Sequence, residues 1–180
     1  MTRVAVLVGS LRADSVNNRL ARTLQVLAPE GVRIEIVEGL GQVPFYNEDL
    51  DGENAPAAAV ALREQVAVAD RVLVVTPEYN ATMPAVLNNA IDWLSRPYGV
   101  GALVGKPFGV LGVTPTPYGG KWAHEDTQRS ARIAGAVVVE DVTVSQSSID
   151  VDVFTDEGVQ ERLRSALATL VEYEAEASAA

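Results

Sequence analysis

The stretch Val4-Ala-Val-Leu-Val-Gly-Ser-Leu-Arg-Ala-Asp-Ser-Val-Asn17 decides the fold of this chain. Its apolar run, residues 4–8, is typical of a buried strand, and a helical pattern begins at Val16 after a short, hydroxyl-rich loop. Such a turn is suited to an anion, because the first N–H groups of a helix lack internal acceptors and the helix dipole is positive at that end. We therefore expect a phosphate site here. The alternative is an ordinary loop with Ser15 as the helix cap.

The side chains of this loop narrow the kind of phosphate. Ser10, Ser15 and Asn17 supply hydrogen-bond donors, and Arg12 supplies a charged fork suited to phosphate. The loop lacks the Gly-Lys-Ser/Thr ending of a P-loop and the Gly-x-Gly-x-x-Gly fingerprint of dinucleotide-binding folds. Hydroxyl groups in place of glycines suit one terminal monophosphate better than a pyrophosphate. A mononucleotide such as FMN is therefore a natural candidate.

Length and charge bound the fold and the partners. A chain of 180 residues is long enough for one domain with a full core, so we expect a single domain over residues 1–180. The net charge of −10 argues against sequence-independent binding to nucleic acid and against attachment to anionic lipid. No apolar stretch reaches transmembrane length and no signal peptide is recognisable, so we expect a cytoplasmic protein without a membrane anchor.

The scarcity of cysteine and histidine limits the chemistry. The chain has no cysteine and a single histidine, His124. This excludes a disulfide, a thiol nucleophile, a Cys-ligated metal and a His-rich metal site, so we expect no bound metal. Redox chemistry would therefore need an organic cofactor. We expect His124 to cap or pack near a helix start rather than to donate a proton.

Five short apolar runs alternate with helical patterns. The expected strands are residues 4–8, 33–37, 71–76, 108–113 and 136–139, the last resuming at 142–144. The expected helices are residues 16–27, 57–68, 84–94, 121–133 and 157–173. This alternation predicts an α/β fold with a parallel sheet covered by helices on both faces, and five strands favour the flavodoxin-like order 2-1-3-4-5. The partly polar second strand is expected at an edge, and residues 174–180 are expected to fray.

Three loops should meet at the carboxyl ends of these strands. They are residues 9–17, residues 76–80 and residues 114–120, all rich in turn formers and hydroxyl groups. Pro77 lacks an N–H and fixes φ, so its neighbours' N–H groups can face a ligand edge. Gly119 and Gly120 let the backbone approach a flat ligand closely. Taken singly, however, the second and third loops are also what any doubly wound sheet shows.

The joint motif is more specific. Gly9-Ser10-x-Arg12-x-x-Ser15-x-Asn17, then Pro77-Glu78-Tyr79-Asn80, then Pro84-Ala-Val-Leu-x-Asn-Ala-Ile-Asp-Trp93 closely resembles the NADPH-dependent FMN reductase family. The resemblance covers nearly the whole chain. That family has a flavodoxin-like fold, binds FMN non-covalently, works as a dimer or tetramer, and includes bacterial quinone reductases that also reduce chromate and azo dyes.

Carried over to this chain, the resemblance implies a complete FMN site. The residues that would hold the phosphate are Ser10, Arg12, Ser15, Val16 and Asn17. Those that would line the ring are Pro77, Glu78, Tyr79, Asn80, Thr114, Thr116, Tyr118, Gly119 and Gly120. The third loop departs from the family pattern Ser-x-Gly-x-x-Gly-Gly, because Thr114 and Thr116 stand where Ser and Gly are usual. The Cβ of Thr116 is expected to narrow the approach to the ring, and Asp14 is expected to face solvent.

These features predict an oxidoreductase with no catalytic side chain, in which the flavin carries hydride from NAD(P)H to a quinone, free flavin, azo compound or chromate. The alternatives are a flavodoxin-type electron carrier and a non-redox flavin-binding module. We also expect a homodimer or homotetramer. Its interface is predicted at an exposed apolar patch made of Phe45, Tyr46, Leu87, Ile91, Trp93 and Leu94.

Overall fold

The protein, described here from a computed structural model over residues 1–174, is built on one five-stranded parallel sheet. The strands are β1 (Thr2–Val8), β2 (Val32–Ile36), β3 (Arg71–Val75), β4 (Pro107–Thr114) and β5 (Val137–Ser147). Their order is β2-β1-β3-β4-β5, which confirms the predicted flavodoxin-like arrangement. The order reverses between β1 and β3, so a crevice is expected at the carboxyl ends of these two strands.

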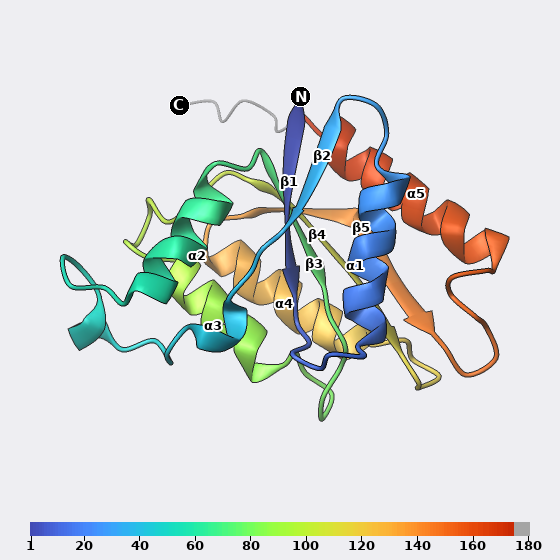
Figure 1. Cartoon of the computed structure of the whole chain (residues 1–180), viewed down its shortest axis with the longest axis horizontal. Coiled ribbons are helices and arrows are strands. Elements are labelled where there is room, and N and C mark those ends of the chain that lie inside the picture. Colours follow the sequence, from blue (N-terminus) through green and yellow to red (C-terminus); the bar gives the residue numbers. More distant parts are fainter. Residues whose placement is uncertain (175–180) are drawn as a thin grey trace.

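Helices cover both faces of the sheet. They are α1 (Val16–Leu27), α2 (Ala57–Ala67), α3 (Ala85–Leu94), α4 (Lys121–Ile133) and α5 (Glu157–Glu172), with short 3₁₀ turns at Leu40–Gln42 and Glu48–Leu50. In Figure 1, α1 and α5 lie to one side of the sheet, and α2 and α3 lie to the other. The core divides in the same way, since α1 and α5 contribute to one buried cluster and α2, α3 and α4 to the other. The loops after β1 and β3 both lie at the lower edge of Figure 1.

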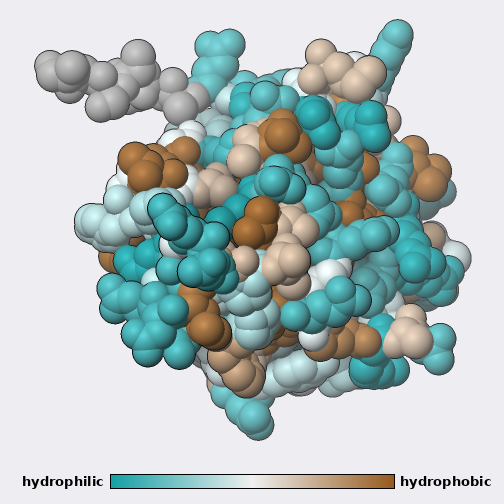
Figure 2. Space-filling view, turned by 60° about the vertical axis from the view of Figure 1, so that its left-hand side comes forward, coloured by the Kyte–Doolittle hydropathy of each residue, from teal (hydrophilic) through white to brown (hydrophobic). Residues whose placement is uncertain are grey.

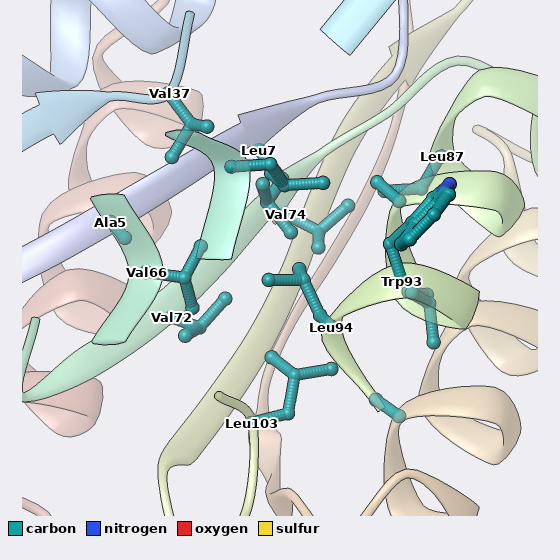
Figure 3. Close-up of a cluster of buried hydrophobic side chains, with 14 of the residues drawn as sticks. Ala5, Leu7, Val37, Val66, Val72, Val74, Leu87, Trp93, Leu94 and Leu103 are labelled. Atoms are coloured by element: carbon teal, nitrogen blue, oxygen red, sulfur yellow. The ribbon is translucent and has the colours of Figure 1, made fainter. Parts of the chain in front are cut away.

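The α3 helix corrects one prediction. Leu87, Ile91, Trp93 and Leu94 were expected in an exposed patch, but they are at most 3% exposed and belong to the core between the sheet and its helices. Figure 3 shows Trp93 and Leu87 on the same helix, turned toward the cluster that also holds side chains of β1 and β3. The run is apolar because it faces the sheet, and a purely sequence-based pattern cannot distinguish that surface from a subunit interface.

The surface around α2 and α3 agrees with this correction. Of the six residues of the predicted patch, Phe45 is 77% exposed and Tyr46 is half-buried against the edge of the Trp93 ring, with ring centroids 5.0 Å apart. Figure 2, which turns this side of the molecule forward, shows hydrophobic residues scattered among hydrophilic ones. The predicted patch therefore does not exist as a contiguous surface.

Strand β5 and the chain end differ in detail from the predictions. The strand is continuous from Val137 to Ser147, but its pairing with β4 shifts between Phe108–Val138 and Val110–Thr143, so the extra residues bulge out of the ladder. The partly polar β2 lies at an edge, as predicted. Most of the predicted frayed tail, residues 175–180, lies outside the described residues. Within residues 1–174, no helix has the length and apolar composition needed to cross a membrane.

Candidate functional site

The loop between β1 and α1 begins with a close crossing. Gly9 donates its N–H to the Val75 carbonyl at 2.9 Å, and a Cβ at Gly9 would collide with the Thr76 side chain. Ser15 has extended backbone geometry and accepts a hydrogen bond from the Asn18 N–H at 3.3 Å, so it caps α1 as the alternative interpretation foresaw. The cap does not exclude a phosphate site, because it occupies only one of the free N–H groups.

The main-chain donors of this loop are unused. Within residues 1–174, none of the N–H groups of residues 10–17 donates a hydrogen bond to the protein. Ser10 is 6% exposed, while Arg12 is exposed and its guanidinium has a single long contact of 3.4 Å to the Asp14 carbonyl. Asp14 is exposed to solvent, as predicted. The loop therefore presents a run of free N–H groups and one free guanidinium at the positive end of a helix.

The Asn17 side chain is hydrogen-bonded within the protein, and its predicted contact with the phosphate stays a prediction. It is 4% exposed, and its amide donates to the Val113 carbonyl at 2.9 Å and accepts from the Val113 N–H at 3.0 Å. This pair of bonds joins α1 to β4. Within residues 1–174, the main-chain N–H of Asn17 has no acceptor, and its side-chain NH2 uses one of its two hydrogens in this pair. The sequence motif could not show this, because the partner lies 96 positions away.

Asn18 was missed by the sequence reasoning. Its side-chain amide donates to the carbonyls of Ser10 and Arg12, at 3.0 and 3.1 Å. These two bonds fix the backbone of the loop between β1 and α1. Asn18 is the third residue of the helix, where side chains often reach back toward the cap. This position in the helix was the feature of the sequence that could have identified Asn18.

The loop between β3 and α3 is a closed turn. Tyr79 and Thr82 exchange two main-chain hydrogen bonds of 3.0 and 3.1 Å around Asn80 and Ala81. Both central residues have positive φ, 52° and 58°, which matches the tight type I′ geometry of two-residue hairpins. The Thr76 hydroxyl donates to the Pro77 carbonyl at 2.9 Å. This loop is therefore fixed by its own bonds.

The same loop is tied to the start of α4. A carboxylate oxygen of Glu78 accepts the N–H of Ala123 at 3.1 Å, where it also faces the positive end of the helix. Tyr79 is 48% exposed, and Asn80 is exposed. The carboxylate of Glu78 is thus occupied within the protein, while the neighbouring side chains remain open to a ligand.

The loop between β4 and α4 combines a hydroxyl pair with two required glycines. The hydroxyl oxygens of Thr114 and Thr116 lie 2.9 Å apart, and Thr114 is 2% exposed. Gly119 and Gly120 have φ of 62° and 90°, which glycine adopts without strain, and a Cβ at Gly119 would collide with the Ser145 backbone. The ring centroids of Tyr118 and Trp122 lie 4.6 Å apart, and both side chains are exposed.

His124 lies beneath these loops. It is 1% exposed, and its Nδ1 lies 2.7 Å from the Ser145 hydroxyl, whereas its Nε2 has no hydrogen-bond partner among the described residues. Burial lowers the pKa of His124 to about 4, and the nearby Thr76 carbonyl, which would favour the charged form, only partly opposes this. The side chain is neutral at pH 7 and packs in the first turn of α4, in line with the prediction.

Direct contacts bring the three predicted loops together at one edge of the sheet. They are the crossing of Gly9 and Thr76, the Asn17–Val113 pair and the bond from Ala123 to Glu78. The first loop offers free N–H groups and a guanidinium. The second is closed by its own hydrogen bonds, the third contains Gly119 and Gly120, and each of these two carries hydroxyl groups and an exposed tyrosine. Such an edge fits a ligand that has one phosphate and one flat ring, which is the chemistry of FMN.

Comparisons with known proteins agree with this geometry. The sequence model of the family described as NADPH-dependent FMN reductase matches residues 2–149. A quinone reductase of Pseudomonas putida is 47% identical over 127 residues, which cover 71% of this chain and 68% of the relative. A 2-hydroxy-1,4-benzoquinone reductase of Burkholderia is 46% identical over 112 residues, covering 62% of this chain and 60% of the relative. The solved structure of FerB, a flavoenzyme NAD(P)H:(acceptor) oxidoreductase from Paracoccus denitrificans, is 32% identical and superposes with a TM-score of 0.85, covering 96% of this chain and 97% of FerB.

Proposed function

Because this chain belongs to the NADPH-dependent FMN reductase family, we propose that it uses non-covalently bound FMN, which when bound takes hydride from NAD(P)H, to reduce a quinone or a similar small acceptor. The quinone is favoured as acceptor because relatives that are 46–47% identical are named quinone and benzoquinone reductases. Free flavin, azo compounds and chromate are the other candidates. The same relatives favour a reductase over a flavodoxin-type carrier and over a non-redox flavin-binding module.

One observation carries the assignment of the phosphate. The free N–H groups of residues 10–17, among them those of Val16 and Asn17, lie at the positive end of α1 beside the Arg12 guanidinium. We assign the FMN phosphate to these groups together with the hydroxyls of Ser10 and Ser15. The side-chain amide of Asn17 fixes the start of α1 through its two hydrogen bonds to Val113 of β4.

The ring is assigned to the loops that follow β3 and β4. Residues 77–80 would present their backbone to one edge of the ring, and Gly119 and Gly120 would let the backbone approach it. Thr114, Thr116 and Tyr118 would border the ring, with the methyl group of Thr116 narrowing the approach. Fixed donors and a fixed shape favour catalysis, because the protein does not have to reorganise as charge develops on the ligand.

No ionisable side chain is required in this proposal. His124 is buried and neutral at pH 7, and the carboxylate of Glu78 is hydrogen-bonded to Ala123. The chain's residues would bind and orient the two substrates and stabilise negative charge through backbone N–H groups. A cytoplasmic location is part of the proposal, since the hydride donor is found in the cytoplasm.

A homodimer, or a pair of dimers, is also proposed. On the α3–α4 side, Tyr98 and Ile133 are 83% and 79% exposed and border a hollow of about 520 Å³. A second hollow of about 530 Å³ is lined by Tyr79 and Asn80, and both hollows share Arg129. A seam on this side would therefore lie beside the proposed ring site. Light scattering should give at least the mass of a dimer for the parent. Ile133→Glu should lower that mass. A monomer mass for the parent at all concentrations would contradict the proposal.

The function is tested by the visible spectrum of the purified protein supplied with FMN. The proposal expects a yellow protein that NADPH bleaches quickly without oxygen and that 1,4-benzoquinone restores. Double-reciprocal plots should give parallel lines, because one ring face serves both substrates in turn. Colour without bleaching would indicate a carrier, absence of colour would indicate a non-redox module, and intersecting lines would require both substrates to bind together.

A further inference from the structure

A hollow of about 360 Å³ lies beside the proposed phosphate loop. It is lined by the start of α1, including Ser15, and by Arg19, Arg22 and Phe154, the last from the segment between β5 and α5. Ser15 and Val16 belong both to this hollow and to the phosphate loop, so the two features are neighbours. Residues 13–16 line both the hollow and the proposed phosphate site, whereas Arg19, Arg22 and Phe154 have no role in the proposals above.

Two arginines without an ion pair lie together at this hollow. Arg19 and Arg22 are exposed and form no ion pair within residues 1–174, although the chain carries 24 Asp and Glu residues against 14 Lys and Arg. Six other arginines are paired with carboxylates, whereas four more form no ion pair within residues 1–174: the paired ones are Arg3, Arg33, Arg63, Arg129, Arg132 and Arg164, and the unpaired ones are Arg12, Arg71, Arg96 and Arg162. Arg19 and Arg22 are three positions apart, so they extend from the same face of α1. The hollow therefore gathers positive charge that the protein itself does not neutralise.

Phe154 holds one of these arginines in place. The guanidinium carbon of Arg19 lies 3.7 Å from the centroid of the Phe154 ring, which is a cation–π stack. Stacking reduces the freedom of the long side chain and leaves its N–H groups available at the edge of the plane, where an oxyanion can bind. The carboxylate of Asp152, two residues before Phe154, accepts the Phe154 N–H at 2.9 Å and does not line the hollow. Among the described residues, one carboxylate (Asp14) and two guanidinium groups line the hollow, so its lining carries net positive charge.

We propose that this hollow binds the adenosine 2′-phosphate end of NADPH, with Arg19 and Arg22 holding the phosphate. The inference rests on the proposed function, which supplies a nucleotide as one substrate and an uncharged quinone as the other. FMN has a single phosphate, already assigned to residues 10–17 with Arg12, so the adjacent pair Arg19 and Arg22 fits the other phosphorylated ligand. NADH lacks the 2′-phosphate, and the site therefore sets a preference for NADPH.

Removing both charges tests the proposal. In Arg19→Gln/Arg22→Gln, the ratio of kcat/KM for NADPH to kcat/KM for NADH should fall about 10- to 100-fold, the scale of lost charge-assisted bonds. The matched control is Arg162→Gln/Arg164→Gln, which removes two exposed arginines of α5 that do not line the hollow. The control should leave the ratio within about twofold, the residual expected from net charge alone. An equal ratio in the parent and the α1 variant would overturn the proposal.

A binding measurement separates this inference from the proposed function. Calorimetric titration with adenosine 2′,5′-bisphosphate needs no turnover. The parent should bind it at least about tenfold more tightly than 5′-AMP, and the α1 variant should lose that difference. Failure of the reductase assay with this binding intact would refute the function but keep the site. A working reductase whose parent form shows no preference for the 2′-phosphate would refute the site alone.

Discussion

The loops that follow β1 and β3 meet at one edge of the sheet but use their hydrogen-bonding groups in opposite ways. Within the described residues 1–174, the main-chain N–H groups of residues 10–17 donate to no protein acceptor, whereas residues 76–82 close on themselves through the Tyr79–Thr82 pair and the Thr76 hydroxyl. A loop with free donors gains its bonds when an anion arrives. A loop that has already made its bonds offers a fixed shape. The difference assigns charge recognition to the first loop and ring positioning to the second.

The largest expected effect concerns the support behind the first loop. Asn17→Ala removes both hydrogen bonds to Val113 and leaves two buried main-chain groups unsatisfied, so the free energy of unfolding should fall by about 4 kcal/mol. Urea unfolding of the FMN-free protein measures it. Asn18→Ala is the matched control, because its carbonyl partners are partly exposed and water can replace the amide. A stable Asn17→Ala protein that fails to bind FMN would instead support the phosphate role first predicted for this side chain.

The loss of stability that His124 causes at acidic pH should be nearly as large. Its pKa is about 4 in the folded protein and near 6.5 in the unfolded chain, so the unfolded chain takes up a proton first as the pH falls. Stability present above pH 6.5 should therefore decline by about 3 kcal/mol between pH 6.5 and pH 4, and not further through this group.

Unfolding curves at several pH values for the parent and for His124→Gln isolate this contribution. The variant should have a shallower decline over the same range. Its turnover should show no new pH dependence between pH 6 and pH 8, because the histidine is neutral there. Identical declines in the two proteins, or a collapse of turnover with FMN still bound, would be incompatible with a buried neutral histidine.

The free guanidinium of the first loop should affect binding and not folding. Arg12→Ala should weaken FMN binding by about 1.5–3 kcal/mol, the usual scale for a charge-assisted hydrogen bond, and Ser10→Ala should weaken it less. Unfolding of the FMN-free protein should be unchanged, since within residues 1–174 the Arg12 side chain has only its long contact to the Asp14 carbonyl. Fluorescence titration measures the affinity, and equal affinities for the parent and Arg12→Ala would remove the assignment.

The smallest effect tests the closure of the second loop. Glu78→Ala removes an acceptor at the start of α4 and should lower stability by about 1 kcal/mol, as for a lost helix cap. Glu78→Gln keeps an oxygen that can accept the Ala123 N–H and should lose less. Thermal unfolding compares the two variants. If they lose equal stability, the hydrogen bond from Ala123 contributes nothing and only the charge matters.

The sequence predicted the local features of the fold well. The helices α1 and α4 begin and end at the predicted residues, and the strand order follows from the alternation of apolar runs with helical patterns. These features depend on neighbours along the chain, namely the hydroxyl-rich turn before α1 and the glycine pair before α4. Ser15 and Gly120, which mark these starts, are visible in a single sequence.

What the sequence missed depends on distant partners. The amide of Asn17 meets Val113 across the sheet edge, and Glu78 meets Ala123 at the next helix. The last strand was predicted as two pieces, residues 136–139 and 142–144, but a register shift lets it continue without a break. The apolar face of α3 packs on the sheet instead of facing a partner. In each case tertiary contacts decide among locally acceptable alternatives.

The central claim, that the loop after β1 recognises a phosphate, is tested most directly by comparing FMN with riboflavin, which has the same ring without the phosphate. Titrations of both ligands into the parent and into Arg12→Ala form a closed cycle. The account predicts that the parent binds FMN at least about 100-fold more tightly than riboflavin, and that Arg12→Ala removes at least tenfold of that preference while riboflavin binding stays the same. Equal binding of FMN and riboflavin by the parent would contradict it.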